Sequence, residues 1–265
     1  MTASSTVHAT PQRVSEVDAV ESTSGAWARL LGAGETVLPA TALHVANLKR
    51  VEHLVSLYES ARSTGSGRAS PAASDLLRAA VVWIHAANET LLRQVLAGVA
   101  RVDMPHVVAV YGRGLYVSGN SEAVQKITLD DLVREAAERP CETLAGFVDR
   151  SLTTALNRLT FNNSNQFAQA LSTIGVDATT LRFKHPQSNN AVTALPVLAA
   201  IAGRRHKIVH ESDVNPETGR GQHQTRSIGR LFVIQGIAAS RAMEVAIHGS
   251  ARLGGPRNLT GGGLH

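Results

Sequence analysis

An arginine and a histidine five positions apart are the residues of this 265-residue sequence whose types and spacing best suit chemistry. Arg205 stands where an amphipathic helix should place a core residue, because four positions on the same helical stripe are apolar: Leu195, Leu198, Ala202 and Val209. A charge in that position needs an acidic partner or a polar cleft. His210 follows in the expected last turn, since residues 213–219 contain the Asn, Pro and Gly that end a helix.

This pair suits the cleavage of an RNA phosphodiester. A histidine accepts and donates protons near neutral pH, so His210 could activate the 2′-hydroxyl or protonate the leaving oxygen. The guanidinium of Arg205 would neutralise the charge that develops on the phosphorus oxygens. On an ideal helix the two side chains are rotated by about 140° and lie more than one turn apart, a separation that a long arginine can bridge.

The segment 205–210, Arg-His-Lys-Ile-Val-His, resembles the R-x4-6-H signature of the HEPN superfamily, and its continuation to residue 213 is most similar to the RiboL-PSP-HEPN branch. The resemblance covers residues 41–249, with His206 in the polar position after the arginine. It implies an all-α bundle, a symmetric dimer that joins two Arg/His pairs, and RNA cleavage without a metal or another cofactor. It also implies a toxin or phage-defence effector, with an antitoxin or regulatory protein as a further partner.

A dimer also follows from the chemistry. One Arg/His pair supplies one proton-transfer group, whereas cleavage needs an acid and a base. We therefore expect a homodimer in which two pairs meet across a twofold axis.

Three further residues are expected to support the site: Glu89, His206 and Arg204. Glu89 interrupts a long apolar helix and needs a cation, so we predict that it pairs with Arg205. His85 shares a helix face with Glu89 at i,i+4 spacing. Arg204 is either a second cation of the site or a surface residue, and we favour the surface.

Basic residues also follow the proposed site. Arg220, His223 and Arg226 belong to a Gly-rich polar segment after residue 213, where cations would suit an RNA backbone. Ordinary solvated loop charges are the alternative for each of them.

Two other functions fit the same residues. His206 lies four positions before His210, a spacing that can chelate a transition metal with a third ligand from Glu211, His85 or Glu89. The neighbouring cations disfavour such a metal hydrolase. A catalytically inactive HEPN-like module that binds RNA or dimerises is the stronger alternative, because a fold resemblance cannot prove activity.

Composition limits the class of protein. The formal charge is +5 and the pI about 9.9, which suits RNA without requiring it. The single cysteine, Cys141, excludes an internal disulfide framework and fits a reducing cytoplasm. No stretch approaches about 18 consecutive apolar residues, so we expect a soluble cytoplasmic protein without a membrane span.

The fold class that we predict is all-α: an up-and-down helical bundle with short extra helices and an irregular insert. Three regions are expected: a flexible arm at 1–40 in which Trp27 could dock a partner, the helical domain at 41–249, and a disordered tail at 250–265. Within the domain, helical periodicity and capping residues predict these elements: 41–64, 71–102, 128–138, 141–161, 167–174, 193–210 and a final helix capped by Ser227, with the irregular insert at 104–127.

Overall fold

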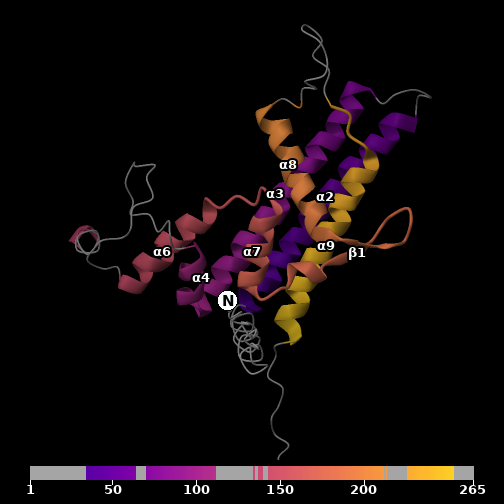
Figure 1. Ribbon diagram of the computed structural model, residues 1–265. Coiled ribbons are helices and arrows are strands. Elements are labelled where there is room, and N and C mark those ends of the chain that lie inside the picture. The colour runs from indigo at the N-terminus through magenta and orange to yellow at the C-terminus, as the bar shows by residue number, and fades with distance from the viewer. Residues whose placement is uncertain are drawn as a thin grey trace, which may run out of the picture.

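The computed structural model describes residues 34–63, 70–111, 134, 137–139, 143–211, 213 and 226–253 (Figure 1). Its helices are α2 (Gly34–Ser63), α3 (Pro71–Val102), α4 (Met104–Tyr111), α6 (Leu144–Asn157), α7 (Ser164–Ile174), α8 (Ala194–His210) and α9 (Arg230–Leu253). A 3-10 turn (Ala178–Thr180) and an antiparallel hairpin of β1 (Arg182–Lys184) and β2 (Ala191–Thr193) precede α8. The predicted all-α helical bundle is confirmed, with this small hairpin as an addition.

The helix α3 is the centre of the bundle. It contacts α2, α8 and α9 on one side and α4, α6 and α7 toward its other end, as Figure 1 shows. Neighbouring helices cover much of its surface, so 16 of its 32 residues are buried. The hydrophobic effect on this one helix therefore holds α2, α8 and α9 together with α4, α6 and α7.

A glycine allows α8 and α9 to approach closely. A Cβ on Gly236 would lie 2.6 Å from Cδ1 of Ile201 and 3.3 Å from Cδ1 of Ile84. Both isoleucines are fully buried, so neither has free space to move into. This contact fixes the C-terminal half of α8 against α9 and α3, and with it the residues that follow in α8.

Several predicted helix boundaries are confirmed. Ser70 begins α3, since its hydroxyl accepts a hydrogen bond of 3.1 Å from the N–H of Ala73. Gly175 ends α7 with a φ of 88°. Thr193 immediately precedes α8, and Pro196 lies in its first turn as predicted.

The start of α2 differs from the prediction. We expected an arm up to residue 40 and a helix capped by Thr41, but α2 begins at Gly34 and includes Pro39. Val37 and Ala40 are buried in the core, and this packing outweighs the weak helix propensity of the segment. The hydroxyl of Thr41 donates to the carbonyl of Leu38 inside the helix, so the predicted cap is wrong. Trp27 lies outside the described residues.

Further boundaries are corrected. The helix predicted at 141–161 is α6 at Leu144–Asn157, and the helix predicted from 167 is α7, which begins at Ser164. Residues 104–111, predicted as part of an irregular insert, form α4, whose start is capped when the Asp103 carboxylate accepts from the N–H of His106 at 3.1 Å. The rest of the insert and the capping-box residues 128–131 lie outside the described residues. The last helix begins at Arg230 and not directly after Ser227.

The helix α9 is the described helix that is apolar and long enough to cross a membrane by length and composition, over Arg230–Ser250. It packs against α2, α3 and α8, and Val233, Ile237 and Met243 are buried in these contacts. Within the bundle, 39% of this apolar span is buried.

Candidate functional site

The two residues of the predicted catalytic pair lie at the C-terminal end of α8. Arg205 is half-buried on the side of the helix that faces the core, between buried Ile201 and partly buried Ile208. His210 is the last residue of α8 and is exposed. The helix rise places the two about 7.5 Å apart along the axis. The predicted inward register of Arg205 agrees with this placement, whereas Val209, predicted on the same apolar stripe, is 48% exposed.

A second imidazole lies beside His210. The ring centroids of His206 and His210 are 4.7 Å apart with their planes tilted by 44°, and both residues are exposed. The i,i+4 spacing produces this contact, as the sequence predicted. Within the described ranges, no group of three or more His, Cys, Asp or Glu side chains is placed to hold a metal ion, so the third ligand that the metal-hydrolase alternative needs is not beside the pair.

The prediction that Glu89 pairs with Arg205 is wrong. Oε1 of Glu89 lies 3.3 Å from Nε2 of His85, and Oε2 lies 3.4 Å from the guanidinium of Arg93. The backbone N–H of Phe161 also donates to Glu89. Burial raises the pKa of the Glu89 carboxyl, but these three groups outweigh burial and the pKa falls below its ordinary value.

The physical reason for this error is the position of each residue along α3. Arg78, in the second turn of α3, lies at the level of the C-terminal half of α8 because it shares a partner with Arg204. Glu89 follows Arg78 by eleven residues, which is about 16 Å along the helix. That separation puts Glu89 beside the α6–α7 connection, far from the end of α8.

Arg204, which we expected on the surface, is the arginine of α8 that makes a buried ion pair. Its Nη2 donates to Oδ2 of Asp213 at 2.8 Å and to the carbonyls of Arg226 and Ser227 at 3.0 and 3.2 Å. The side chain of Asp213 is 1% exposed. Burial lowers the pKa of the Arg204 guanidinium. The positive charges of Arg78 and Arg226 also lower this pKa, whereas the carboxylate of Asp213 raises it.

Arg78 binds the same carboxylate from α3. Its Nε donates to Oδ2 of Asp213 at 2.8 Å, and its Nη2 donates to the carbonyl of Arg226 at 2.9 Å. Its Nη1 donates to the exposed carboxylate of Asp75 at 2.9 Å. Two guanidiniums therefore converge on one buried oxygen, which joins α3, α8 and the segment before α9.

The backbone conformation of Asp213 turns its carboxylate toward the two guanidiniums. Its φ is +53°, a left-handed conformation that aspartate adopts more readily than most residues. Its N–H donates to the carbonyl of Lys207, and its own carbonyl accepts from the N–H of Arg226 at 2.8 Å. The turn brings the carboxylate back against Arg204 and fixes the chain immediately after His210.

Of the three residues predicted to bind RNA, Arg226 is described and Arg220 and His223 lie outside the described residues. The carbonyl of Arg226 accepts from Arg78 and Arg204. Its guanidinium lies 4.0 Å from the exposed carboxylate of Glu211. Arg226 is thus a partly buried part of the ionic cluster as well as a cation near the end of α8.

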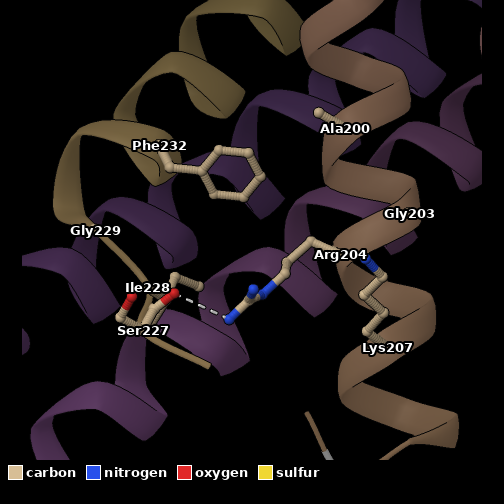
Figure 2. A pocket seen from close by; sticks show the side chains of 8 residues that line it. All are labelled: Ala200, Gly203, Arg204, Lys207, Ser227, Ile228, Gly229 and Phe232. Carbon is tan, nitrogen blue, oxygen red and sulfur yellow. Dashed lines mark hydrogen bonds between the residues drawn. The ribbon is translucent and has the colours of Figure 1, made fainter. Parts of the chain in front are cut away.

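A pocket of about 440 Å³ opens between α8 and the start of α9. Figure 2 shows the ring of Phe232 extending from α9 toward α8, with Arg204 crossing below it to Ser227. Its lining residues are Ala200, Gly203, Arg204, Lys207, Ser227, Ile228, Gly229 and Phe232. The pocket combines two cations with an aromatic ring, one turn before His210.

Sequence reasoning missed the parts of the site that come from different segments. Arg78, Lys207 and Phe232 were not proposed as functional, and Asp213 was identified only as a helix stop. A signal was available for Arg78, because a cation between Leu77 and Val81 on an apolar helix needs an anion. No sequence signal indicated which carboxylate would supply it.

No protein-family model, curated protein or solved structure matches this chain. The fold and site described above define a basic all-α bundle with an ionic cluster at one end.

Proposed function

We propose that the protein is a metal-independent endoribonuclease in which Arg205 and His210 act on an RNA phosphodiester. The observation that carries the proposal is their shared position in the last two turns of α8. His210 is exposed to a ligand, and Arg205 is half-buried and has no acidic partner among the described residues. A cation without an acidic partner among the described residues, five positions before an accessible imidazole on the same helix, suits a phosphate that a long arginine and the histidine could both reach.

The proposed reaction is an internal transesterification. His210 accepts the proton of the 2′-hydroxyl as its oxygen attacks phosphorus, and the bond from phosphorus to the 5′-oxygen breaks. Arg205 neutralises the charge on the non-bridging oxygens during this step. A proton donated to the leaving oxygen yields a 5′-hydroxyl, and the other product ends in a 2′,3′-cyclic phosphate.

The second proton-transfer group comes from a second copy of the chain in this proposal. His206 is a poor candidate for that role, because ring centroids 4.7 Å apart leave no room for a phosphate between the two imidazoles. A homodimer with two Arg205/His210 pairs would supply an acid and a base, as the HEPN resemblance implies. His206 then supports His210 by contact.

The biological setting of the proposal comes from the same resemblance. A ribonuclease of this kind would act in the cytoplasm as a toxin or phage-defence effector, held in check by an antitoxin or a regulatory protein. Exposed Lys207 and the net charge of +5 favour attraction of RNA to this end of the protein.

The test is cleavage of single-stranded RNA in excess EDTA, with the product ends identified. We expect 2′,3′-cyclic phosphate ends and a loss of about 10²–10⁴-fold in His210→Ala, the usual contribution of one general acid or base. His53→Ala removes an exposed histidine of α2 and serves as the matched control. Unchanged cleavage by a folded His210→Ala protein would refute the proposal, and cleavage that EDTA abolishes would favour the His206/His210 metal hydrolase instead.

The second candidate is a non-catalytic RNA-binding or dimerisation module. The cations around the end of α8, Arg204, Lys207 and Arg226, favour it as much as they favour the enzyme. It predicts RNA binding that weakens steeply with salt, with no cleavage in any buffer.

A further inference from the structure

The pocket between α8 and α9 is not used by the reaction proposed above. The space next to two of its glycines is open, since a Cβ on Gly203 or on Gly229 would meet nothing within 4 Å. Its volume of about 440 Å³ lies within the range of about 300–1,000 Å³ that is typical of small-molecule sites. The ring of Phe232 and the side chain of Ile228 give it an apolar wall, as Figure 2 shows for the ring.

The cations of the pocket favour an anion. All the hydrogen bonds that Arg204 makes to described residues come from Nη2, and its buried Nε has no partner there. Arg78 shares the same oxygen of Asp213 and also contacts the exposed carboxylate of Asp75, so Arg204 shares its one carboxylate with a second guanidinium. Lys207 is exposed and adds a mobile positive charge at the pocket rim.

The direction of the pocket connects it to the proposed site. Its lining residues on α8, at positions 200, 203, 204 and 207, recur at steps of three and four and so share one helix face. His210 is the next residue at this spacing and lies about 4.5 Å further along the axis. The Lys207 end of the pocket is therefore about one helical turn from the residue that carries the imidazole.

We propose that this pocket binds one nucleotide of the RNA strand next to the phosphate that is cleaved, with its base against Phe232 and its phosphate beside Lys207 and Arg204. The inference rests on the proposed function. A nucleotide combines the flat aromatic surface and the negative charge that the pocket walls match, and stacking of a base on an aromatic side chain contributes about 1–3 kcal/mol. A free mononucleotide has the same chemistry, so the experiment separates the two sources.

The experiment measures binding in the His210→Ala background, so that cleavage does not interfere. The first probe is a fluorescent single-stranded oligonucleotide with 2′-deoxy residues. In a second arm the probe is adenosine monophosphate, and calorimetry measures its binding. Gly203→Leu places a side chain in the open space of the pocket. Gly249→Leu is the matched control, because Gly249 is a glycine of α9 whose added Cβ also meets nothing within 4 Å.

We expect Gly203→Leu to weaken oligonucleotide binding at least tenfold, while Gly249→Leu binds like the parent. Thermal unfolding checks that both variants remain folded; replacing a helical glycine by leucine should not lower Tm, since leucine is the better helix former. If Gly203→Leu weakens binding of the oligonucleotide but not of adenosine monophosphate, the pocket binds a nucleotide of an RNA strand. If Gly203→Leu weakens binding of both probes, the pocket binds a nucleotide from either source.

A second pair of variants tests the stacking surface. Phe232 also packs against the core, so Phe232→Leu keeps an apolar side chain but removes the ring, and Phe232→Tyr keeps the ring. We expect about tenfold weaker binding for Phe232→Leu and near-parent binding for Phe232→Tyr, with the Tm of both variants close to that of the parent. Weaker binding of Phe232→Leu that is accompanied by a matching loss of Tm would show a structural role of the ring instead.

The two proposals fail separately. If the wild type cuts no RNA but Gly203→Leu weakens nucleotide binding, the pocket is supported and the ribonuclease is not. If the wild type cuts RNA and Gly203→Leu binds both probes as Gly249→Leu does, the pocket inference is overturned. Absence of binding of either probe to the parent protein would overturn it as well.

Discussion

Two ionic clusters on α3 differ in how the chain assembles them. Near the start of the helix, Arg78 reaches a carboxylate 135 residues away, that of Asp213. Near the middle, Glu89 is flanked by His85 and Arg93, each four residues away on the same helix. Helix geometry alone creates the second cluster, whereas the first exists only when three segments are packed together.

The clusters differ in burial as well. The side chain of Asp213 is 1% exposed, and that of Glu89 is 13% exposed. Removing one partner of a buried pair leaves an uncompensated charge away from water, which costs far more than losing a surface pair. The comparison therefore predicts a graded series of stability effects.

Asp213→Ala should have the largest effect. It leaves Arg78 and Arg204 without their shared carboxylate, and we expect a loss of about 3–5 kcal/mol in the free energy of unfolding. Urea unfolding followed by circular dichroism measures this. Glu211→Ala, which removes a neighbouring exposed carboxylate, is the control and should change stability by less than about 1 kcal/mol. Equal losses in the two variants would show that the buried cluster does not hold the end of α8.

Glu89→Gln should have an intermediate effect that depends on pH. The folded-state pKa of this carboxyl lies below its ordinary value of 4.5, so the ionised form stabilises the fold at neutral pH. That contribution is fully present above the unfolded-state pKa and is lost as the pH falls through the folded-state value. We expect wild type and Glu89→Gln to differ at pH 7 and to converge in urea unfolding as the pH falls through the folded-state pKa, which lies below 4.5. A difference that is constant with pH would contradict this assignment.

Asp75→Ala should have the smallest effect. Asp75 is 69% exposed and contacts Arg78 at i,i+3 spacing, so its loss should cost about 0–1 kcal/mol. The same unfolding assay compares it with Asp213→Ala. A loss as large as that of Asp213→Ala would mean that the exposed carboxylate, and not the buried one, compensates Arg78.

Much of the fold could be predicted because its signals are local. Ser70, Gly175 and Pro196 mark helix boundaries through cap and proline chemistry that acts within a few residues. The start of α2 was missed because burial of Val37 overrides weak local propensity. The hairpin before α8 was missed because its three-residue strands are too short to show a period.

In the candidate site, too, only the local contacts could be predicted from the sequence. The contact between His206 and His210 follows from their spacing alone. The partner of Glu89 was mistaken because both Glu89 and Arg205 need a counterion, and the sequence contains no measure of the distance between two helices. The pocket residue Phe232 comes from α9, and no periodicity within α8 points to it.

The sequence by itself determined which residues share a face of α8, because the helical repeat places Arg205 toward the core and His210 at the exposed end. Tertiary structure decided that Arg204, rather than Arg205, joins a buried carboxylate. It did so through the left-handed turn at Asp213 and the antiparallel packing of α3 against α8, which bring distant charges to hydrogen-bond distance. A buried charge needs a partner, but only the packed chain selects which partner is within reach.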